Sequence, residues 1–145
     1  MDYREVLMKK AFICLCIAIG VVAGSAYADV LIVTNKDVPE SNITQQDIKD
    51  IFLGKKTKWS NSEKIHFVLV KDPAVHDGFV KNYLQKSPSQ FQNYWKNMVF
   101  TGEGKTPTTF ESTQELIEYV SKTPGAVGYI DSTSTAVNVK TLNVE

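Results

Sequence analysis

The chain has 145 residues, with 16 basic and 16 acidic side chains, two cysteines and 43% hydrophobic residues. That length corresponds to a single domain, and the hydrophobic fraction excludes general disorder. A formal net charge of zero excludes the strongly basic surface of nucleic-acid-binding proteins and of polybasic membrane-surface proteins. We therefore expect no nucleic-acid partner.

Residues 1–28 have the features of a secretory signal peptide. A positive n-region, an uncharged and mostly apolar run, and a small-x-small cleavage site follow one another: Arg4, Lys9 and Lys10, then Ala11 to Ala23, then Ala26-Tyr27-Ala28. An uncleaved membrane anchor is the alternative, but it needs about 20 apolar residues, and this run has 13. We predict a signal peptide at 1–28, initiation at Met1 or Met8, and a periplasmic location.

Cleavage would leave residues 29–145, which contain 13 Lys, 14 acidic residues and no Arg. Both cysteines, Cys14 and Cys16, lie in the predicted leader, so we expect no disulfide, thiolate metal site or Cys nucleophile in the mature chain. Arg is the usual bidentate partner of phosphate and carboxylate groups. Any anion site must therefore use Lys, hydroxyls, backbone N–H groups or a helix N-terminus.

The first predicted element of the mature chain is a buried strand at Val30–Thr34, which is apolar on both faces. A helix follows, with Thr44 as its N-cap and Gly54 at its end. Its apolar face consists of Ile48, Ile51 and Phe52. The polar turn at 55–62 holds Trp59, which we expect either to cover the edge of the core or to line a groove.

A second strand is predicted at Ile65–Val70, with His66 at its beginning, and the Lys-Asp-Pro sequence at 71–73 ends it. The next helix has apolar residues at helical spacing from Val75 to Leu84. Ser87-Pro88 then supplies an N-cap and a proline at the first position of a further helix. An aromatic stripe on that helix is expected to face the core; it consists of Phe91, Tyr94, Trp95 and Met98.

Residues 101–105 form a glycine-containing loop, and Pro107 extends the irregular stretch. Ser112 to Glu115 is a capping box before a helix that runs through Val120. Strands are then predicted at Ala126–Ile130 and at Val137–Leu142. The alternation of strands and helices predicts an α/β fold with a mainly parallel or mixed sheet flanked by helices.

The sequence contains little that is typical of an enzyme. Its two histidines, His66 and His76, lack metal-binding spacing, and there is no nucleophile elbow, phosphate-binding loop or dinucleotide fingerprint. We expect no catalytic residue, no metal and no cofactor, with His66 structural and His76 exposed. A hydrolase or transferase that uses His76 and Asp77 is an alternative, but adjacent helix residues point in different directions.

Four segments of the mature chain carry a resemblance: Ile43 to Gly54 (ITQQDIKDIFLG), Lys58-Trp59, Tyr94-Trp95 with Phe100-Thr101-Gly102, and Pro124 to Tyr129 (PGAVGY). Their order and spacing resemble the phosphate-binding periplasmic proteins of ABC importers. They are most similar to short, single-lobe proteins described as phosphate ABC transporter substrate-binding proteins. The resemblance implies the type 2 periplasmic-binding-protein fold, with residues 29–145 forming one lobe.

The chain departs from that family where the anion is bound. The resemblance implies two lobes in full-length members, which close on an oxyanion through backbone N–H groups, with an Arg and a Ser-Gly-Thr turn at one helix start. This chain reads KDPAVHD at 71–77, so Lys71 is the nearby cation, and Asp72 and Asp77 would repel an anion. The candidate ligand-binding residues are Thr34, Asn35, Lys71, Ala74, Val75, His76, Thr101 and Gly102.

These observations lead to two hypotheses about function. In the first, the chain is an exported, non-enzymatic solute-binding protein that takes phosphate or a related oxyanion in ABC-type phosphate uptake. In the second, the same fold without a ligand is a periplasmic protein-interaction module. The expected partners are a membrane transporter or sensor, or a second copy of the chain. A concave site with converging N–H groups would favour the first hypothesis, and a flat apolar patch around Trp59 the second.

Overall fold

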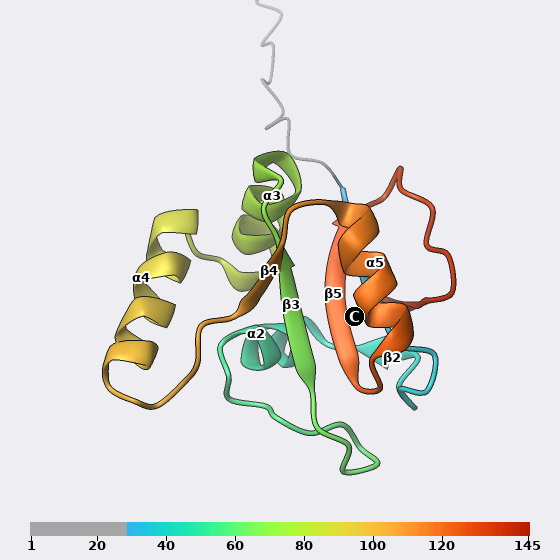
Figure 1. The fold of residues 1–145 in the computed structure, drawn as a ribbon, viewed down its shortest axis with the longest axis horizontal. Coiled ribbons are helices and arrows are strands. Elements are labelled where there is room, and N and C mark those ends of the chain that lie inside the picture. Colours follow the sequence, from blue (N-terminus) through green and yellow to red (C-terminus); the bar gives the residue numbers. More distant parts are fainter. Residues whose placement is uncertain (1–28) are drawn as a thin grey trace, which may run out of the picture.

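The computed structural model describes residues 29–145, which form a six-stranded mixed sheet with helices on both faces (Figure 1). The predicted signal peptide lies outside the described residues. The strands are β1 (Val30–Thr34), β2 (Asn42–Ile43), β3 (His66–Val70), β4 (Thr108–Phe110), β5 (Ala126–Asp131) and β6 (Lys140–Val144). The helices are α2 (Gln45–Phe52), α3 (Pro73–Leu84), α4 (Pro88–Phe100) and α5 (Thr113–Lys122). The predicted α/β fold with a mixed sheet is confirmed.

The directions of the strands decide which loops can meet. The sheet order is β2-β6-β1-β5-β3-β4. β1 is antiparallel to both of its neighbours, β5 and β6, whereas β3 is parallel to β4 and β5. Thr34 therefore lies level with Val127, and His66 with Ala126, at one end of the sheet. Lys71 follows the carboxyl end of β3 and lies at the other end.

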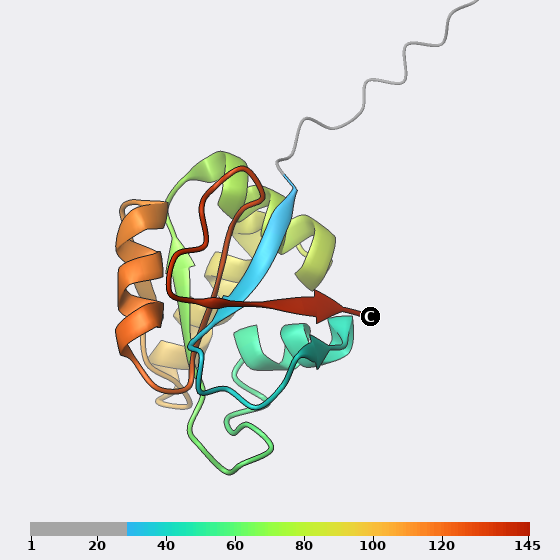
Figure 2. The same ribbon diagram turned by 90° about the vertical axis from the view of Figure 1, so that its right-hand side faces the viewer.

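Helices α3 and α5 cover opposite faces of the sheet, as Figure 2 shows. Successive strand residues point to opposite faces, and Gly128 and Tyr129 are neighbours in β5. A Cβ on Gly128 would lie 2.9 Å from Leu116 of α5, while the ring of Tyr129 stacks on Phe79 of α3 with centroids 3.9 Å apart. On the α5 face, Leu116 packs so close to the strand that a side chain at position 128 would displace it, whereas on the α3 face the next residue, Tyr129, packs an aromatic ring against Phe79.

An aromatic cluster fills the core between the sheet and helices α2 and α3. The Phe52 ring of α2 lies 4.7 Å from Phe79 and 5.3 Å from Phe67, measured between centroids. Aromatic pairs of this kind contribute about 0.5–1.5 kcal/mol each beyond the burial of their area. Trp59 is also buried, and its indole N–H donates to the carbonyl of Gly125 at 2.9 Å. It covers the edge of the core, which was one of the two predicted roles.

The predicted N-caps of α2 and α4 are confirmed. The Thr44 hydroxyl accepts a hydrogen bond from the Asp47 N–H at 3.0 Å. Ser87 and Gln90 form a complete capping box, in which each side chain accepts from the other residue's N–H. The aromatic stripe on α4 also packs as predicted, because Phe91 and Trp95 are buried and its other members are half-buried against the core.

The predicted capping box at Ser112 is only half formed. The Ser112 hydroxyl accepts from the Glu115 N–H at 3.2 Å. The Glu115 carboxylate accepts from the N–H of Glu111 at 3.3 Å instead of returning to Ser112. The chain leaves β4 at Phe110, and this turn presents the Glu111 N–H to the carboxylate.

Two strands were not predicted, and the bounds of a third need correction. The sequence did not predict β2 or β4, which have two and three residues and are too short for a periodic pattern. The last strand begins at Lys140, not at Val137, because its pairing with β1 joins Thr34 to Lys140 and Ile32 to Leu142.

Within residues 29–145, the structure contains no helix of the length and apolarity that crossing a membrane requires.

Candidate functional site

The structure brings four of the eight predicted ligand residues together. Lys71, Ala74, Val75 and His76 lie where β3 ends and α3 begins. Thr34 and Asn35 lie at the opposite end of the sheet, because β1 is antiparallel to β5. Thr101 and Gly102 are exposed at the C-terminal end of α4. The candidate site is therefore the start of α3.

Asn35 is buried and hydrogen-bonded within the fold, and it does not face an open site. Its side-chain amide donates to the carbonyl of Val120 at 3.0 Å, and its backbone N–H donates to the carbonyl of Ala126. These bonds tie the end of β1 to the end of α5 and the start of β5. Thr34 is fully buried, and its hydroxyl has no hydrogen-bond partner among the described residues.

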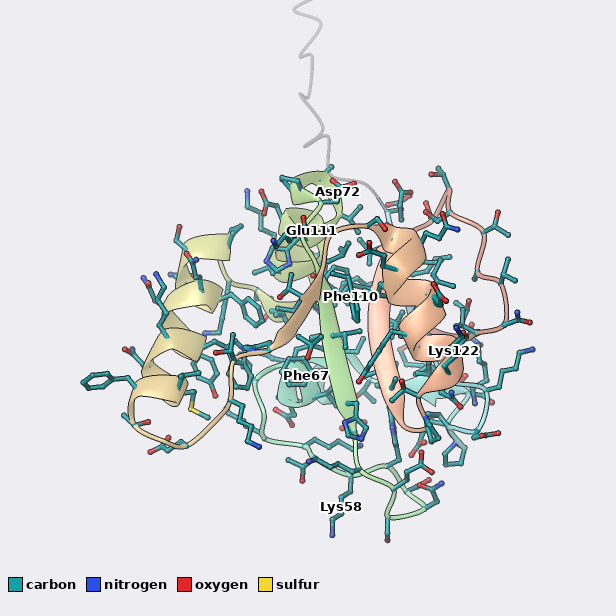
Figure 3. All side chains as sticks on the ribbon, viewed as in Figure 1. Lys58, Phe67, Asp72, Phe110, Glu111 and Lys122 are labelled. Carbon is teal, nitrogen blue, oxygen red and sulfur yellow. The ribbon has the colours of Figure 1, made fainter. Side chains whose placement is uncertain are left out.

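Two carboxylates stand at the start of α3, as Figure 3 shows for Asp72 and Glu111. Asp72 is the N-cap of the helix, and its side chain accepts from the Ala74 N–H at 3.1 Å. The ammonium group of Lys71 forms an exposed ion pair with Glu111. Pro73 has no N–H, and the N–H groups of Ala74 and His76 both donate to Asp72. The helix start and Lys71 are thus already partly satisfied by groups of the chain itself.

His76 is half-buried, which corrects the prediction that it is exposed. Its Nδ1 lies 2.5 Å from the hydroxyl of Tyr129, a fully buried side chain of β5. The same hydroxyl accepts from the Val70 N–H at 3.3 Å. The correction has a tertiary cause, because Tyr129 is 53 positions away in the sequence.

The protonation of this pair follows from its burial. Burial raises the pKa of the Tyr129 phenol well above its ordinary value of 10, so the phenol keeps its proton. Burial lowers the pKa of His76 from 6.5, although Asp77 acts in the opposite direction. The neutral His76 ring therefore accepts the Tyr129 O–H at Nδ1, which assigns the remaining ring proton to Nε2.

A groove of about 730 Å³ opens beside this site, between α4 and the edge formed by β3 and β4. Figure 1 shows α4 alongside the β4 edge of the sheet. The lining residues are Leu69, Val70, Lys71, His76, Pro88, Ser89, Phe91, Gln92, Trp95, Lys96, Val99, Phe100, Thr106, Pro107 and Thr109. Both charged side chains in this lining are lysines, and most of the others are apolar or aromatic. A concave, mainly apolar space of this size with a few polar groups is typical of a ligand site.

The described residues contain no group of three or more His, Cys, Asp or Glu side chains that could hold a metal ion. The Nδ1 atom of His76 pairs with the Tyr129 hydroxyl, and the neighbouring Asp77 is the next residue on α3. The start of α3 thus supplies hydrogen-bond donors and the Lys71 cation beside an apolar groove, which is suited to binding.

Residues 25–144 match the family PBP_like_2, which is described as a PBP superfamily domain. The chain belongs to the PBP superfamily. No curated protein matches the chain significantly.

Solved structures of phosphate-transport proteins share the fold of this superfamily member. One is an ABC-type phosphate transport receptor from Vibrio cholerae, with 21% identity and a TM-score of 0.56 over 82% of this chain and 47% of that chain. Another is PstS from Borrelia burgdorferi, with 20% identity and a TM-score of 0.59 over 83% and 48%. A structure from Clostridium perfringens, described as a putative phosphate ABC transporter substrate-binding protein with bound phosphate, has 19% identity and a TM-score of 0.62 over 82% and 46%. The chain spans about half the length of these structures, as expected of a single lobe.

Sequence reasoning missed the groove. The stripe of Phe91 and Trp95 on α4 was correctly assigned to the core, but Gln92, Lys96 and Val99 on the same helix line the groove. These three side chains are an amide, a cation and an aliphatic group, so no shared chemistry marks them in the sequence as one surface. The opposite wall includes Thr109 of β4, a strand that the sequence did not predict.

Proposed function

We propose that this PBP-superfamily chain is an exported, non-enzymatic solute-binding protein that takes phosphate or a related oxyanion and works with an ABC-type phosphate transporter. The observation that carries the proposal is the gathering of Lys71, Ala74, Val75 and His76 at the start of α3. The positive end of the dipole of this 12-residue helix lies at this point, where the N–H groups of Ala74 and His76 already donate to Asp72. The likeness to phosphate-transport proteins and the leader-like residues 1–28 support the transport role and export.

Binding by this lobe alone would be weak. An exposed pair between Lys71 and an anion contributes roughly 0–1 kcal/mol, and a helix N-terminus contributes about 0.3–1 kcal/mol. A dissociation constant of 1 mM requires about 4 kcal/mol. The proposed function therefore includes a partner that closes over the start of α3, either the transporter itself or a second copy of the chain.

Thermal unfolding in the presence of oxyanions tests the proposal. Phosphate and sulfate, titrated to about 100 mM at constant ionic strength with chloride as the reference anion, should raise the Tm by mass action. Lys71→Gln should remove most of this shift. Lys58→Gln is the matched control, because Lys58 is also exposed but lies at the far end of the molecule from Asp72 (Figure 3). No shift with any oxyanion would refute anion binding, and an equal loss in both variants would refute the start of α3 as the anion site.

A protein-interaction module is the second candidate, and a specific observation favours it. The Asp72 carboxylate accepts from the Ala74 N–H, and Glu111 pairs with Lys71, so the chain's own carboxylates meet the groups that would hold an anion. If oxyanions leave the Tm unchanged, cross-linking in the periplasm through a photoreactive residue at position 100 should capture a specific partner. Phe100 is suitable because its side chain is 92% exposed.

A further inference from the structure

We propose that the groove between α4 and the β3–β4 edge binds an organic monocarboxylate, with the acid group at Lys71 and His76 and the apolar body along α4. This inference rests on the solute-binding part of the proposed function and uses the same site. It replaces phosphate with a ligand that has an apolar body and a single negative charge.

The walls of the groove fit an apolar body. Phe91 and Trp95 are buried in the face of α4 that borders the groove, and Leu69 and Pro107 contribute from the sheet side. Trp95 is held in place, since its indole N–H donates to the Phe52 carbonyl at 3.1 Å. The lining spans α4 from Pro88 to Phe100, a length of roughly 20 Å at 1.5 Å per residue. A space of this shape and volume holds an elongated molecule that is far larger than phosphate.

The exposed apolar residues continue the same surface. Val99 is 40% exposed and Phe100 is 92% exposed, and both line the groove. Large apolar side chains that are exposed next to one another mark surfaces that bind other molecules. They lie at the C-terminal end of α4, so the apolar body would extend from the start of α3 toward this end.

The polar groups of the groove fit an acid group. Its charged lining residues are Lys71 and Lys96, and no Asp or Glu belongs to the lining. His76 adds a neutral donor: because Tyr129 occupies Nδ1, the ring is held in one orientation with its proton on Nε2. A carboxylate accepts hydrogen bonds from both kinds of donor.

The surroundings of Lys71 favour one negative charge over two. Glu111 already pairs with Lys71, and Asp72 caps the start of α3. A doubly charged phosphate group would bring its second charge toward these carboxylates, whereas a carboxylate has a single charge to be balanced. The absence of Arg from residues 29–145 points the same way, since Arg is suited to bidentate binding of phosphate.

An extended peptide is a less suitable occupant of the groove. The Phe110 carbonyl accepts from the Lys71 N–H, so Phe110 directs its backbone groups toward β3. Backbone groups alternate in direction along a strand, which leaves Thr109 as the one residue of β4 that directs both groups outward. Pro107 precedes it and has no N–H to donate. One residue offers too few main-chain hydrogen bonds for the addition of a strand.

Isothermal titration calorimetry with four small molecules tests the inference. The probe is 4-phenylbutyrate, and the comparisons are 4-phenylbutan-1-ol, butyrate and inorganic phosphate. We expect 4-phenylbutyrate to bind at least about tenfold more tightly than each of the other three, because only it combines the apolar body with the acid group. The fluorescence of Trp95, which lines the groove, should change in the same titration.

Two variants of α4 locate the bound acid. Gln92 and Asn93 are both exposed neighbours on α4, but only Gln92 lines the groove. Gln92→Glu should weaken the binding of 4-phenylbutyrate by about fivefold or more, through repulsion of the carboxylate. Asn93→Asp adds the same charge outside the groove and should change the affinity by less than about twofold. Neither substitution alters a buried group, so both variants are expected to fold.

The outcomes separate this inference from the proposed function. Binding of phosphate with Lys71 dependence, without binding of 4-phenylbutyrate, overturns the inference and leaves the proposed function standing. Binding of neither overturns both. Equal affinity for the acid and the alcohol, or equal weakening in both α4 variants, also overturns the inference. Selective binding of 4-phenylbutyrate that is lost in Gln92→Glu supports it.

Discussion

Replacement of Gly125 by Ala should destabilise the protein far more than the same replacement at Gly102. Both glycines have a positive φ, at 77° and 76°. An added Cβ at Gly125 would lie 2.2 Å from the backbone carbonyl oxygen of Lys64, whereas at Gly102 no atom lies within 4 Å. The pair thus separates a steric clash from backbone strain.

The expected size of the effect follows from the contacts of Gly125. The positive φ costs an alanine about 1–2 kcal/mol at either position. At Gly125 the clash is with backbone, so the chain must move, and the Gly125 carbonyl accepts from the Trp59 indole at 2.9 Å and from the His66 N–H at 3.1 Å. A buried donor that loses its partner costs about 1–3 kcal/mol. We expect Gly125→Ala to lose roughly 3–5 kcal/mol of unfolding free energy and Gly102→Ala about 1–2 kcal/mol.

Urea unfolding followed by tryptophan fluorescence measures this difference. The gain from a less flexible unfolded chain is the same for both Gly-to-Ala changes and cancels between them. The slopes of unfolding free energy against urea should match, so that the midpoints report stability. The emission of Trp59 should also shift to the red in Gly125→Ala, because its partner moves. A difference of less than about 1 kcal/mol between the two variants would refute the packing argument for Gly125.

Three further predictions concern the buried pair and a helix cap. Tyr129→Phe removes the hydroxyl that bonds both Val70 and His76. It should lower the free energy of unfolding by about 1–3 kcal/mol in urea and raise the pKa of His76 in an NMR titration. An unchanged His76 pKa would contradict the assigned hydrogen bond. Because burial lowers the pKa of His76 in the folded state, the unfolded chain binds more protons than the folded chain as the pH falls through about 6.5. The free energy of unfolding should therefore decrease as the pH falls over that range and level off below the folded pKa. His76→Gln should lose this component of the pH dependence. Ser87→Ala breaks the capping box with Gln90 and should lower stability by about 1 kcal/mol, whereas Ser89→Ala, an exposed neighbour on the same helix, should cost less than half as much.

Local signals in the sequence predicted the elements that contain them. The strand at Val30–Thr34 was predicted with its observed bounds because apolar residues fill both of its faces. Thr44 and Ser87 were predicted as N-caps because a helix start needs an acceptor for its free N–H groups within three residues. At Ser112 the predicted N-cap also formed, but the Glu115 carboxylate accepts from the N–H of Glu111 instead of that of Ser112.

The candidate site was predicted in part for a similar reason. Lys71 and His76 were predicted together because they are close in the sequence, and the structure places both at the start of α3. Thr34 belonged to the predicted set, but the antiparallel pairing of β1 with β5 places it at the other end of the sheet. The direction of a strand depends on partners that are nearly 100 positions away, and no short segment encodes it.

The sequence by itself determined the α/β class, most of the helices and strands, and the membership of the superfamily, because these depend on patterns and motifs within short segments. Only the tertiary structure decided the groove beside α4, the half-burial of His76 and its bond to Tyr129. These features arise where β3, β4, β5 and two helices pack together. Residues that meet there lie far apart in the sequence: Lys71 and Glu111 are 40 positions apart, and His76 and Tyr129 are 53 apart. Packing buries His76 and so lowers its pKa, and packing also brings the apolar side chains of α4 and β3 together along one groove.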